Sequence, residues 1–211
     1  MIPQRPHAAW DAPLSFAVPD GSFFLLQASP ARAGTLLRLC LGMATARTGD
    51  VEVLGARPAR LDRRASQRFR REVGTGLVPH GLISNLTLRM NVVVPLVYGG
   101  LAQPDEAARR ADDAIAACGL ARWADERPAD APPDARQRAV VARAIARAPR
   151  LLLLEDPVWS VDADVAAELL ALCRARVRTV LVALPRRDDV VSRLADHVAS
   201  WDDAAFRMDI A

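Results

Sequence analysis

Four consecutive leucines, Leu151 to Leu154, constrain the fold of this chain more than any other feature. They stand between Arg150 and Glu155. A short run of branched apolar residues with polar ends is typical of a strand that is buried on both faces, and such strands belong to parallel sheets covered by helices. The sequence therefore predicts the α/β class.

The rest of the chain alternates short apolar segments with helical patterns, as a largely parallel sheet requires. Further strands are predicted at Phe23 to Leu26, Val51 to Leu54, Thr179 to Leu184 and His197 to Trp201. Helices are predicted from near Thr35, within Asn85 to Tyr98 with a break at Pro95, from Pro104, from Asp134 to Ala148 with Asp134 as N-cap, from Ala163 to Arg176 and from Asp188 to Leu194. We expect a single domain over residues 1–211, with a small helical subdomain at about residues 100–148.

Nothing in the sequence resembles a membrane span or a signal peptide. The longest apolar stretch, Val92 to Ala102, is interrupted by Pro95 and two glycines and falls short of the roughly 18 residues that a span needs. The 3 cysteines are scattered and odd in number, and no histidine lies at a metal-ligand spacing from them. We therefore expect a soluble, cytoplasmic chain with free, buried thiols.

The positive charge of the chain is carried by arginine alone. All 28 basic residues are arginines, set against 25 acidic residues for a net charge of +3. Seven of them lie between Arg57 and Arg71, where Phe69 is the only aromatic residue that could stack on a base. This run favours a solvated helical face over a phosphate-binding surface, and we expect no nucleic-acid partner.

Three stretches in one order carry a family resemblance. They are Gly34 to Leu39 with Gly49 to Gly55, then Ser84 to Val92, then Arg136 to Ile145 leading to Leu151 to Pro157. Together they resemble an ABC transporter ATP-binding subunit over roughly residues 16–206. The resemblance implies a P-loop NTPase-like ABC ATPase fold with ATP and Mg²⁺ as cofactors. The continuation Asn91 to Leu96 is similar to ATPases that are paired with MCE-type phospholipid transport systems.

The phosphate-binding loop of the family is altered at each defining position. The pattern G-x-x-x-x-G-K-[ST] falls on residues 27–34, where Ala33 replaces the lysine, Arg32 replaces a glycine and Pro30 removes an N–H donor. A deletion of one residue would instead place Gly34 and Thr35 on the last glycine and the magnesium-binding hydroxyl, still without lysine. Gly34 and Thr35 are thus the candidates for a vestigial ATP site, and a plain strand-to-helix turn is the alternative.

The catalytic carboxylates of the family are present in reversed order. The resemblance implies that Glu155 holds Mg²⁺ through water, that Asp156 acts as the catalytic base, and that Asp162 contacts nucleotide as the D-loop aspartate. The exchange makes the side chain at position 155 one methylene longer and the side chain at position 156 one methylene shorter than in the family. A displacement of about 1 Å can cost roughly 100-fold in rate. The alternative is that both carboxylates cap the strand end and meet arginines.

The signature motif L-S-G-G-Q, which grips the nucleotide of the opposite subunit in this family, is replaced by Ala131 to Ala135. Pro132 and Pro133 delete N–H donors from this segment. Asp134 would place a negative charge against phosphate. The sequence therefore predicts that this segment does not bind a nucleotide phosphate.

Three further family positions also depart from the pattern. The Q-loop glutamine falls on Val78, or on His80 with a shift of two residues, and the switch histidine falls on Pro185. Trp10 or Phe16 could supply the aromatic ring that stacks on adenine.

ABC subunits act as head-to-tail dimers, and each composite site takes elements from both chains. Because both halves are altered here, neither a homodimer nor a heterodimer with another ABC ATPase subunit would contain an intact site. The first hypothesis is a structural or regulatory pseudo-ATPase, cytoplasmic and peripheral at the inner face of the cell membrane. It would contact an integral membrane permease through Leu82 to Leu96, in lipid transport by the resemblance. The alternatives are an active ATPase with Arg32 in place of lysine, and a stand-alone interaction protein or relic.

Overall fold

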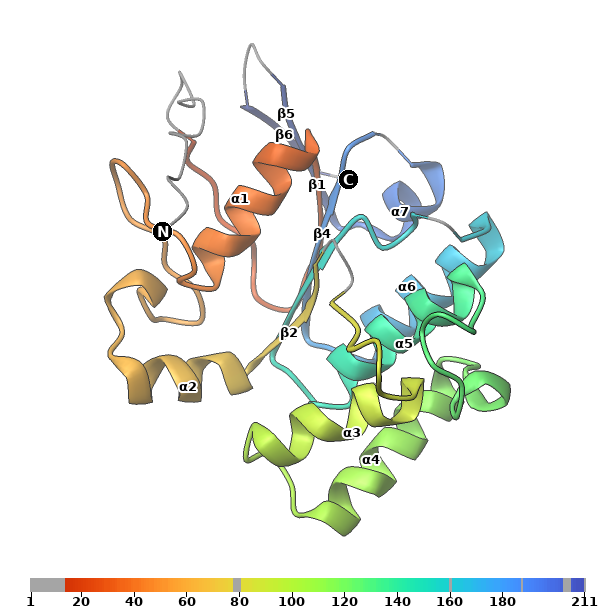
Figure 1. The fold of residues 1–211 in the computed structure, drawn as a ribbon. Helices are drawn as coiled ribbons and strands as arrows, with labels where there is room; N and C mark the ends of the chain where they lie inside the picture. The colour runs from red at the N-terminus through yellow and green to blue at the C-terminus, as the bar shows by residue number, and fades with distance from the viewer. Residues whose placement is uncertain (1–13, 78–80, 160, 187, 203–205, 211) are drawn as a thin grey trace.

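The fold is built around one six-stranded sheet with helices on both faces (Figure 1). The computed structural model describes residues 14–77, 81–159, 161–186, 188–202 and 206–210. The strands are β1 (Phe23–Ala28), β2 (Val73–Gly76), β3 (Leu151–Glu155), β4 (Thr179–Leu184), β5 (His197–Trp201) and β6 (Phe206–Ile210). Their order in the sheet is β2-β3-β4-β1-β5-β6, with β6 antiparallel to β5 and all other pairs parallel.

The helices divide between the two faces of this sheet. They are α1 (Pro30–Cys40), α2 (Arg63–Arg71), α3 (Leu88–Tyr98), α4 (Pro104–Ala117), α5 (Pro133–Ile145), α6 (Ala163–Arg176) and α7 (Asp189–Leu194), with short 3-10 turns at Pro58–Arg60 and Ala121–Trp123. α1 and α2 cover one face, and α3 to α7 lie on the other (Figure 1). Successive residues of β1 point to opposite faces of the sheet, so this strand contributes to both cores. Phe24 and Leu26 pack with α1, while Phe23 and Leu25 pack on the face covered by α3 to α7. The predicted α/β class is confirmed.

The start of α1 differs from the sequence-based expectation. A loop was expected up to Gly34 with a helix from near Thr35, but β1 continues to Ala28 and the helix begins at Pro30. Proline is well suited to the first helical position, since its φ is already helical and its missing N–H is not needed there. The expected loop is therefore the first turn of a helix.

The strand predicted at Val51 to Leu54 is wrong. Val53 forms only an isolated antiparallel bridge with Ala56. The chain reverses directly between them, because Leu54 and Gly55 have φ values of 51° and 76°. A turn this tight leaves no length for a strand.

Two helix predictions need correction. Pro95 does not break its helix, because α3 runs through it to Tyr98, held by packing against α4 and α5. The N-cap of α5 is Pro132, and Asp134 lies in the first turn.

The strands β2 and β6 were not predicted. In β2 the alternation of apolar and polar residues is not visible, because Gly74 and Gly76 occupy two of the four positions. Larger side chains would not fit at these positions, where the sheet is closely covered. A Cβ on Gly74 would lie 2.9 Å from the Ala144 carbonyl oxygen, and one on Gly76 would lie 2.9 Å from a Leu154 methyl.

The three cysteines are buried, free thiols, as predicted. Burial raises the pKa of the Cys40 and Cys118 thiols to about 12 and that of Cys173 further still, so none is primed as a thiolate. Among the residues that the structure describes, no helix is both long and apolar enough to cross a membrane.

Candidate functional site

The candidate site lies at the carboxyl ends of β1, β3 and β4, the edge where parallel α/β sheets bind ligands. Glu155 ends β3 and Asp156 follows it; Ser29 follows β1 and Pro185 follows β4. The sheet order β3-β4-β1 makes these three strand ends neighbours. The fold thus brings together Gly34, Glu155 and Asp156, three of the residues predicted from sequence.

A phosphate cradle needs a loop whose backbone N–H groups point to the ligand. Between β1 and α1 there is a single residue, Ser29, whose side chain makes no capping hydrogen bond. The Ala33 N–H donates to the Ser29 carbonyl over 2.9 Å, so it belongs to the helix, and Pro30 has no N–H to donate. Ala33, at the position of the family's lysine, is 2% exposed. This junction has the geometry of a strand-to-helix turn.

The missing side chain of Gly34 makes room for two charged groups. A Cβ built there would lie 2.7 Å from Arg38 Nη1 and 2.8 Å from Glu155 Oε1, so both groups occupy the space in front of α1. Glu155 is buried, and its extra methylene carries the carboxylate into this space. Thr35 has its hydroxyl turned back on its own helix, where Oγ1 donates to the Ala31 carbonyl over 2.7 Å.

Asp156 is held in an unusual backbone conformation, with a φ of 44°. Its N–H donates to the Ala183 carbonyl over 2.8 Å, which ties it to β4. Burial raises the pKa of this carboxyl, and the charge of Glu155 raises it further against the opposing effect of Arg186. A carboxyl with a raised pKa is a better proton acceptor than an exposed aspartate.

The N-terminus of α5, where the signature segment falls, begins with two prolines. Pro132 is the N-cap and makes no side-chain capping bond, and Pro133 follows at the first helical position. The Asp134 carboxylate lies 4.0 Å from Arg138 Nε, one turn along the same helix. Neither proline can donate an N–H from the position where an anion would approach the helix.

The other predicted positions are spread more widely. Asp162 is the exposed N-cap of α6 and its side chain makes no cap hydrogen bond. Phe16 stacks on Phe206 with ring centroids 5.2 Å apart and also meets Phe24, so it packs within the fold. Trp10, Val78 and His80 lie outside the described residues.

Two charged residues of this site, Arg38 and Arg186, were missed from sequence. Arg38 lies one helical turn after Gly34, so a helix correctly begun at Pro30 would have placed both on one side of α1. Arg186 follows Pro185 and acts on Asp156 through its charge. Only the sheet order, which puts β4 beside β3, makes that proximity visible.

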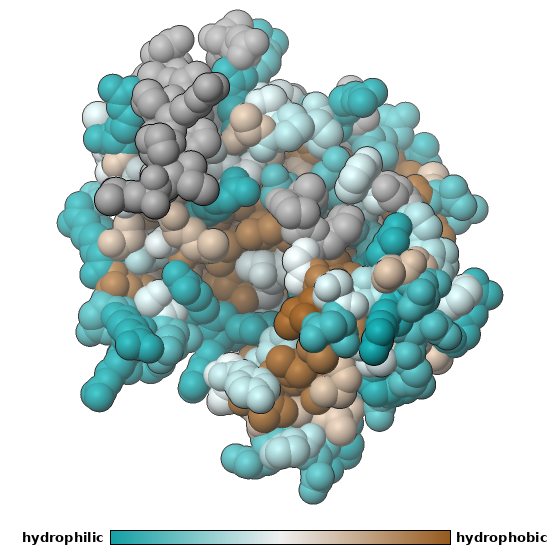
Figure 2. All heavy atoms as spheres, viewed as in Figure 1, coloured by the Kyte–Doolittle hydropathy of each residue, from teal (hydrophilic) through white to brown (hydrophobic). Residues whose placement is uncertain are grey.

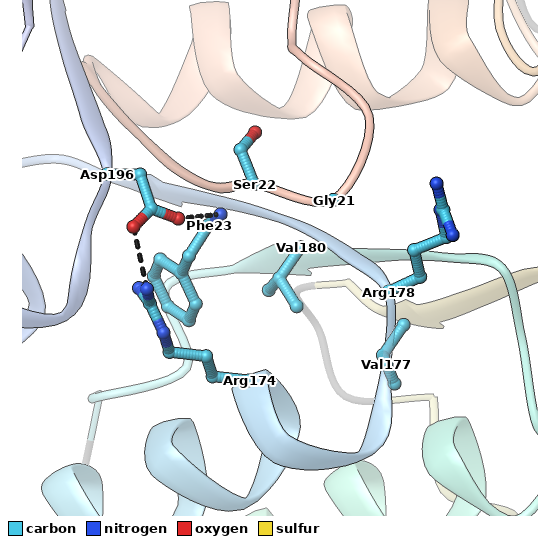
Figure 3. Close-up of a pocket in the computed structure, with 8 residues that line it drawn as sticks. All are labelled: Gly21, Ser22, Phe23, Arg174, Val177, Arg178, Val180 and Asp196. Atoms are coloured by element: carbon cyan, nitrogen blue, oxygen red, sulfur yellow. Dashed lines mark hydrogen bonds and ion pairs between the residues drawn. The ribbon is translucent and has the colours of Figure 1, made fainter.

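A second cavity, of about 110 Å³, lies at the opposite edge of the sheet, where β1 and β4 begin (Figure 3). Asp196 accepts hydrogen bonds there from the Phe23 N–H over 2.8 Å and from Arg174 Nη2 over 2.6 Å. These two bonds hold the pKa of the Asp196 carboxyl below its usual range. These polar groups satisfy one another's hydrogen bonds, and they link the start of β1 to α6. Within the described residues, no group of three or more potential metal ligands occurs.

Comparisons with known proteins agree with this geometry. The family model described as "ABC transporter" matches residues 24–159. The methionine import ATP-binding protein MetN 1 of Pseudomonas fluorescens is 30% identical over 194 residues, covering 90% of this chain and 58% of that protein. MetN 2 of Pseudomonas entomophila matches to the same extent, so the chain spans less than two thirds of the length of these relatives.

Solved structures show the same fold. The ATP-binding cassette MJ0796, in a dimeric post-hydrolysis state with ADP and Pi, aligns with a TM-score of 0.82 and 24% identity, covering 92% of this chain and 88% of that one. The protein cbiO1 from Clostridium perfringens, part of the ABC transporter complex cbiONQ, aligns with a TM-score of 0.77 and 18% identity, covering 92% and 78%.

Proposed function

This chain belongs to the ABC transporter family of ATP-binding proteins, and we propose that it is a subunit that does not hydrolyse ATP efficiently. The observation that carries this proposal is the start of α1 at Pro30. It converts the segment aligned with the phosphate loop into helix and buries Ala33 where the family has lysine. ATP and Mg²⁺ would then lack both the cradle and the cation that hold the outer phosphates.

The remaining elements support the same proposal. In the family's head-to-tail dimer each site joins phosphate-loop and catalytic residues of one chain to the signature segment of the other. Here Glu155 and Asp156 are exchanged, and Pro132 and Pro133 begin the signature helix. A homodimer or a heterodimer containing this chain would therefore have no complete site.

The competing function is an active ATPase in which Arg32 replaces lysine and Asp156 is the base. The Arg32 guanidinium carbon lies 5.5 Å from the centroid of the Trp201 ring, in a cation–π contact. That contact would have to break for Arg32 to reach a phosphate. It therefore favours the non-hydrolysing subunit.

We infer that the chain works at the inner face of the membrane, docked on an integral membrane permease through Leu82 to Leu96. Ile83 and Met90 in this segment are large apolar residues that stay 46% and 39% exposed. Figure 2 shows hydrophobic residues gathered on the surface over α3 and the segment that leads into it. Exposed apolar patches on otherwise polar surfaces mark interfaces.

Two measurements test the proposal together. Phosphate release from Mg–ATP is measured for the chain and for Asp156→Asn, and both are expected at the background rate; turnover that disappears in Asp156→Asn would establish the active ATPase instead. Purification from native membranes is expected to bring down an integral membrane permease. A chain that purifies alone would favour a stand-alone interaction protein.

The same purification tests the cargo. We propose lipid transport from the similarity of Asn91 to Leu96 to ATPases of MCE-type systems. A permease with an MCE-type lipid-binding protein would support this. A methionine permease, as the names of the curated relatives imply for those proteins, would overturn it.

A further inference from the structure

A cavity of about 210 Å³ lies between β2, α3 and α5, close to the segment proposed to meet the permease. It is lined by Thr75, Pro95, Arg143, Ala144 and Arg147. No carboxylate is among the described residues that line it, although two arginines are. Two arginines that line one small cavity are an unusual feature in a folded chain, because arginine is seldom buried.

One nitrogen in this cavity has no hydrogen bond. Arg147 Nη2 donates to the Arg70 carbonyl over 2.6 Å, but Arg147 Nε is buried and has no partner among the described residues. Arg143 Nη1 donates to the Gly81 carbonyl over 2.8 Å. Both guanidinium groups are therefore anchored by backbone carbonyls, and a buried donor such as Arg147 Nε costs free energy until a partner reaches it.

Burial lowers the pKa of both arginines, and the charge of Arg147 lowers that of Arg143 further. Burial and the repulsion between the two like charges thus make the charged forms of these arginines less favourable. An acidic group entering the cavity would oppose both effects and could accept from Nε. Carboxylates pair with guanidinium groups through charge-assisted hydrogen bonds, which are the strongest available to arginine.

The helices next to the cavity carry exposed aromatic and basic side chains. Tyr98 follows Pro95 by one turn of α3 and is 87% exposed. Arg71 of α2 lies near Gly100, which follows α3, and it shares one side of α2 with Arg64 and Arg68. A segment that covers this surface therefore needs apolar side chains for α3 and negative charge for the arginines.

We propose that this cavity receives an aspartate or glutamate side chain from an amphipathic cytoplasmic segment of the membrane permease. The inference rests on the proposed permease partner and names the chemistry of its docking segment. A protein segment fits better than a lipid surface, since Arg147 Nε is buried in a recess that a flat layer of headgroups would not enter. The carboxylate would bind Arg147 Nε and fix the register of the partner on α3.

A carboxylate supplied by the chain itself tests the cavity without any partner. Pro95 lines the cavity, so Pro95→Glu places an acidic group in it and Pro95→Gln is the matched neutral control. Both variants remove the same helical proline. We expect Pro95→Glu to melt about 2–4 °C above Pro95→Gln, and this difference to disappear when each is combined with Arg147→Gln. Equal melting temperatures of the two variants would overturn the proposal.

The second arm uses the permease that purifies with the chain. Arg147→Gln is expected to weaken its binding at least about tenfold, which corresponds to one charged hydrogen bond. Arg109→Gln, which removes an exposed arginine of α4, should leave binding unchanged. Equal binding by the Arg147 variant and the original chain would overturn the inference while the permease proposal stands.

Vesicles containing phosphatidylglycerol separate a protein partner from a lipid one. We expect vesicle binding by the full chain to be the same with Arg147 and with Arg147→Gln. Vesicle binding that depends on Arg147 would assign the cavity to lipid headgroups and overturn the peptide proposal. If no permease purifies with the chain, the proposed function fails, and the Pro95 comparison still decides whether the cavity takes a carboxylate.

Discussion

Ala33 occupies the position at which the family's lysine would bind phosphate, and its surroundings exclude a charged side chain. It packs in the core between α1 and the sheet, in a cluster that contains Leu37 and Leu181. A lysine at this position would have to leave its charge in apolar surroundings. A lysine is therefore expected to be poorly tolerated at this position.

Ala33→Lys should destabilise the chain by roughly 3 kcal/mol or more without creating ATP binding, because it buries a charge and overfills the core. Ala31→Lys, on the exposed side of the same helical turn, is the matched control and should change stability by less than about 0.5 kcal/mol. Urea unfolding gives both values. A stable Ala33→Lys chain that binds ATP would show that the phosphate loop can still form.

Asp196 gives the chain a pH dependence. Its folded pKa is lowered, first by the Phe23 N–H and then by Arg174, so its contribution to stability is complete above the unfolded value of about 4 and is lost as the pH falls through the folded value. Asp196→Asn should cost about 1 kcal/mol at pH 7, a modest amount because the carboxylate is partly exposed. Urea unfolding should show this difference shrinking toward about pH 2. A difference that persists undiminished at low pH would contradict this assignment.

At the scale of elements, the junction of β1 and α1 decides whether a ligand loop exists. In the structure the helical hydrogen bonds begin with Ala33 N–H to Ser29, within the segment aligned with the phosphate loop. A loop of the family's kind would leave these N–H groups open to a ligand. The junction therefore predicts a specific pattern of amide exchange.

The Ala33 amide should exchange slowly and should not respond to Mg–ATP. The Ala31 amide, which belongs to the same turn but lies too early to have a partner within the helix, should exchange quickly and serves as the internal control. Hydrogen exchange followed by NMR measures both. Fast exchange at Ala33 that slows on addition of Mg–ATP would mean that the segment is a binding loop.

The buried strands and long helices could be predicted from sequence, since Leu151 to Leu154 and residues 163–176 carry strong periodic signals. The start of α1 could not be predicted, because two signals conflicted. The family alignment indicated a loop, whereas Pro30 favoured a helix start, and the structure has a helix from Pro30. Likewise, Glu155 and Asp156 could be placed at a strand end. Their neighbour Arg186 could not, since its position depends on which strands pair.

In the whole molecule the fold of the family is retained, and the proposed loss of hydrolysis concerns the carboxyl edge of the sheet and the start of α5. The sheet is a single one of six strands, and each of its faces is covered by a packed core. A chain that no longer bound a partner or a ligand would have no need of exposed apolar residues over α3 or of a desolvated pair of arginines beside them. We therefore propose that the α3–α5 surface docks on a partner and that the carboxyl edge of the sheet has lost hydrolysis.

Equilibrium binding of Mg–ATP to the purified chain, alone and with its permease, shows whether a nucleotide site remains. We expect no saturable binding up to about 1 mM by isothermal titration calorimetry, because the segment aligned with the phosphate loop is helical from Pro30. Saturable binding with a dissociation constant well below that concentration, in either setting, would contradict this expectation.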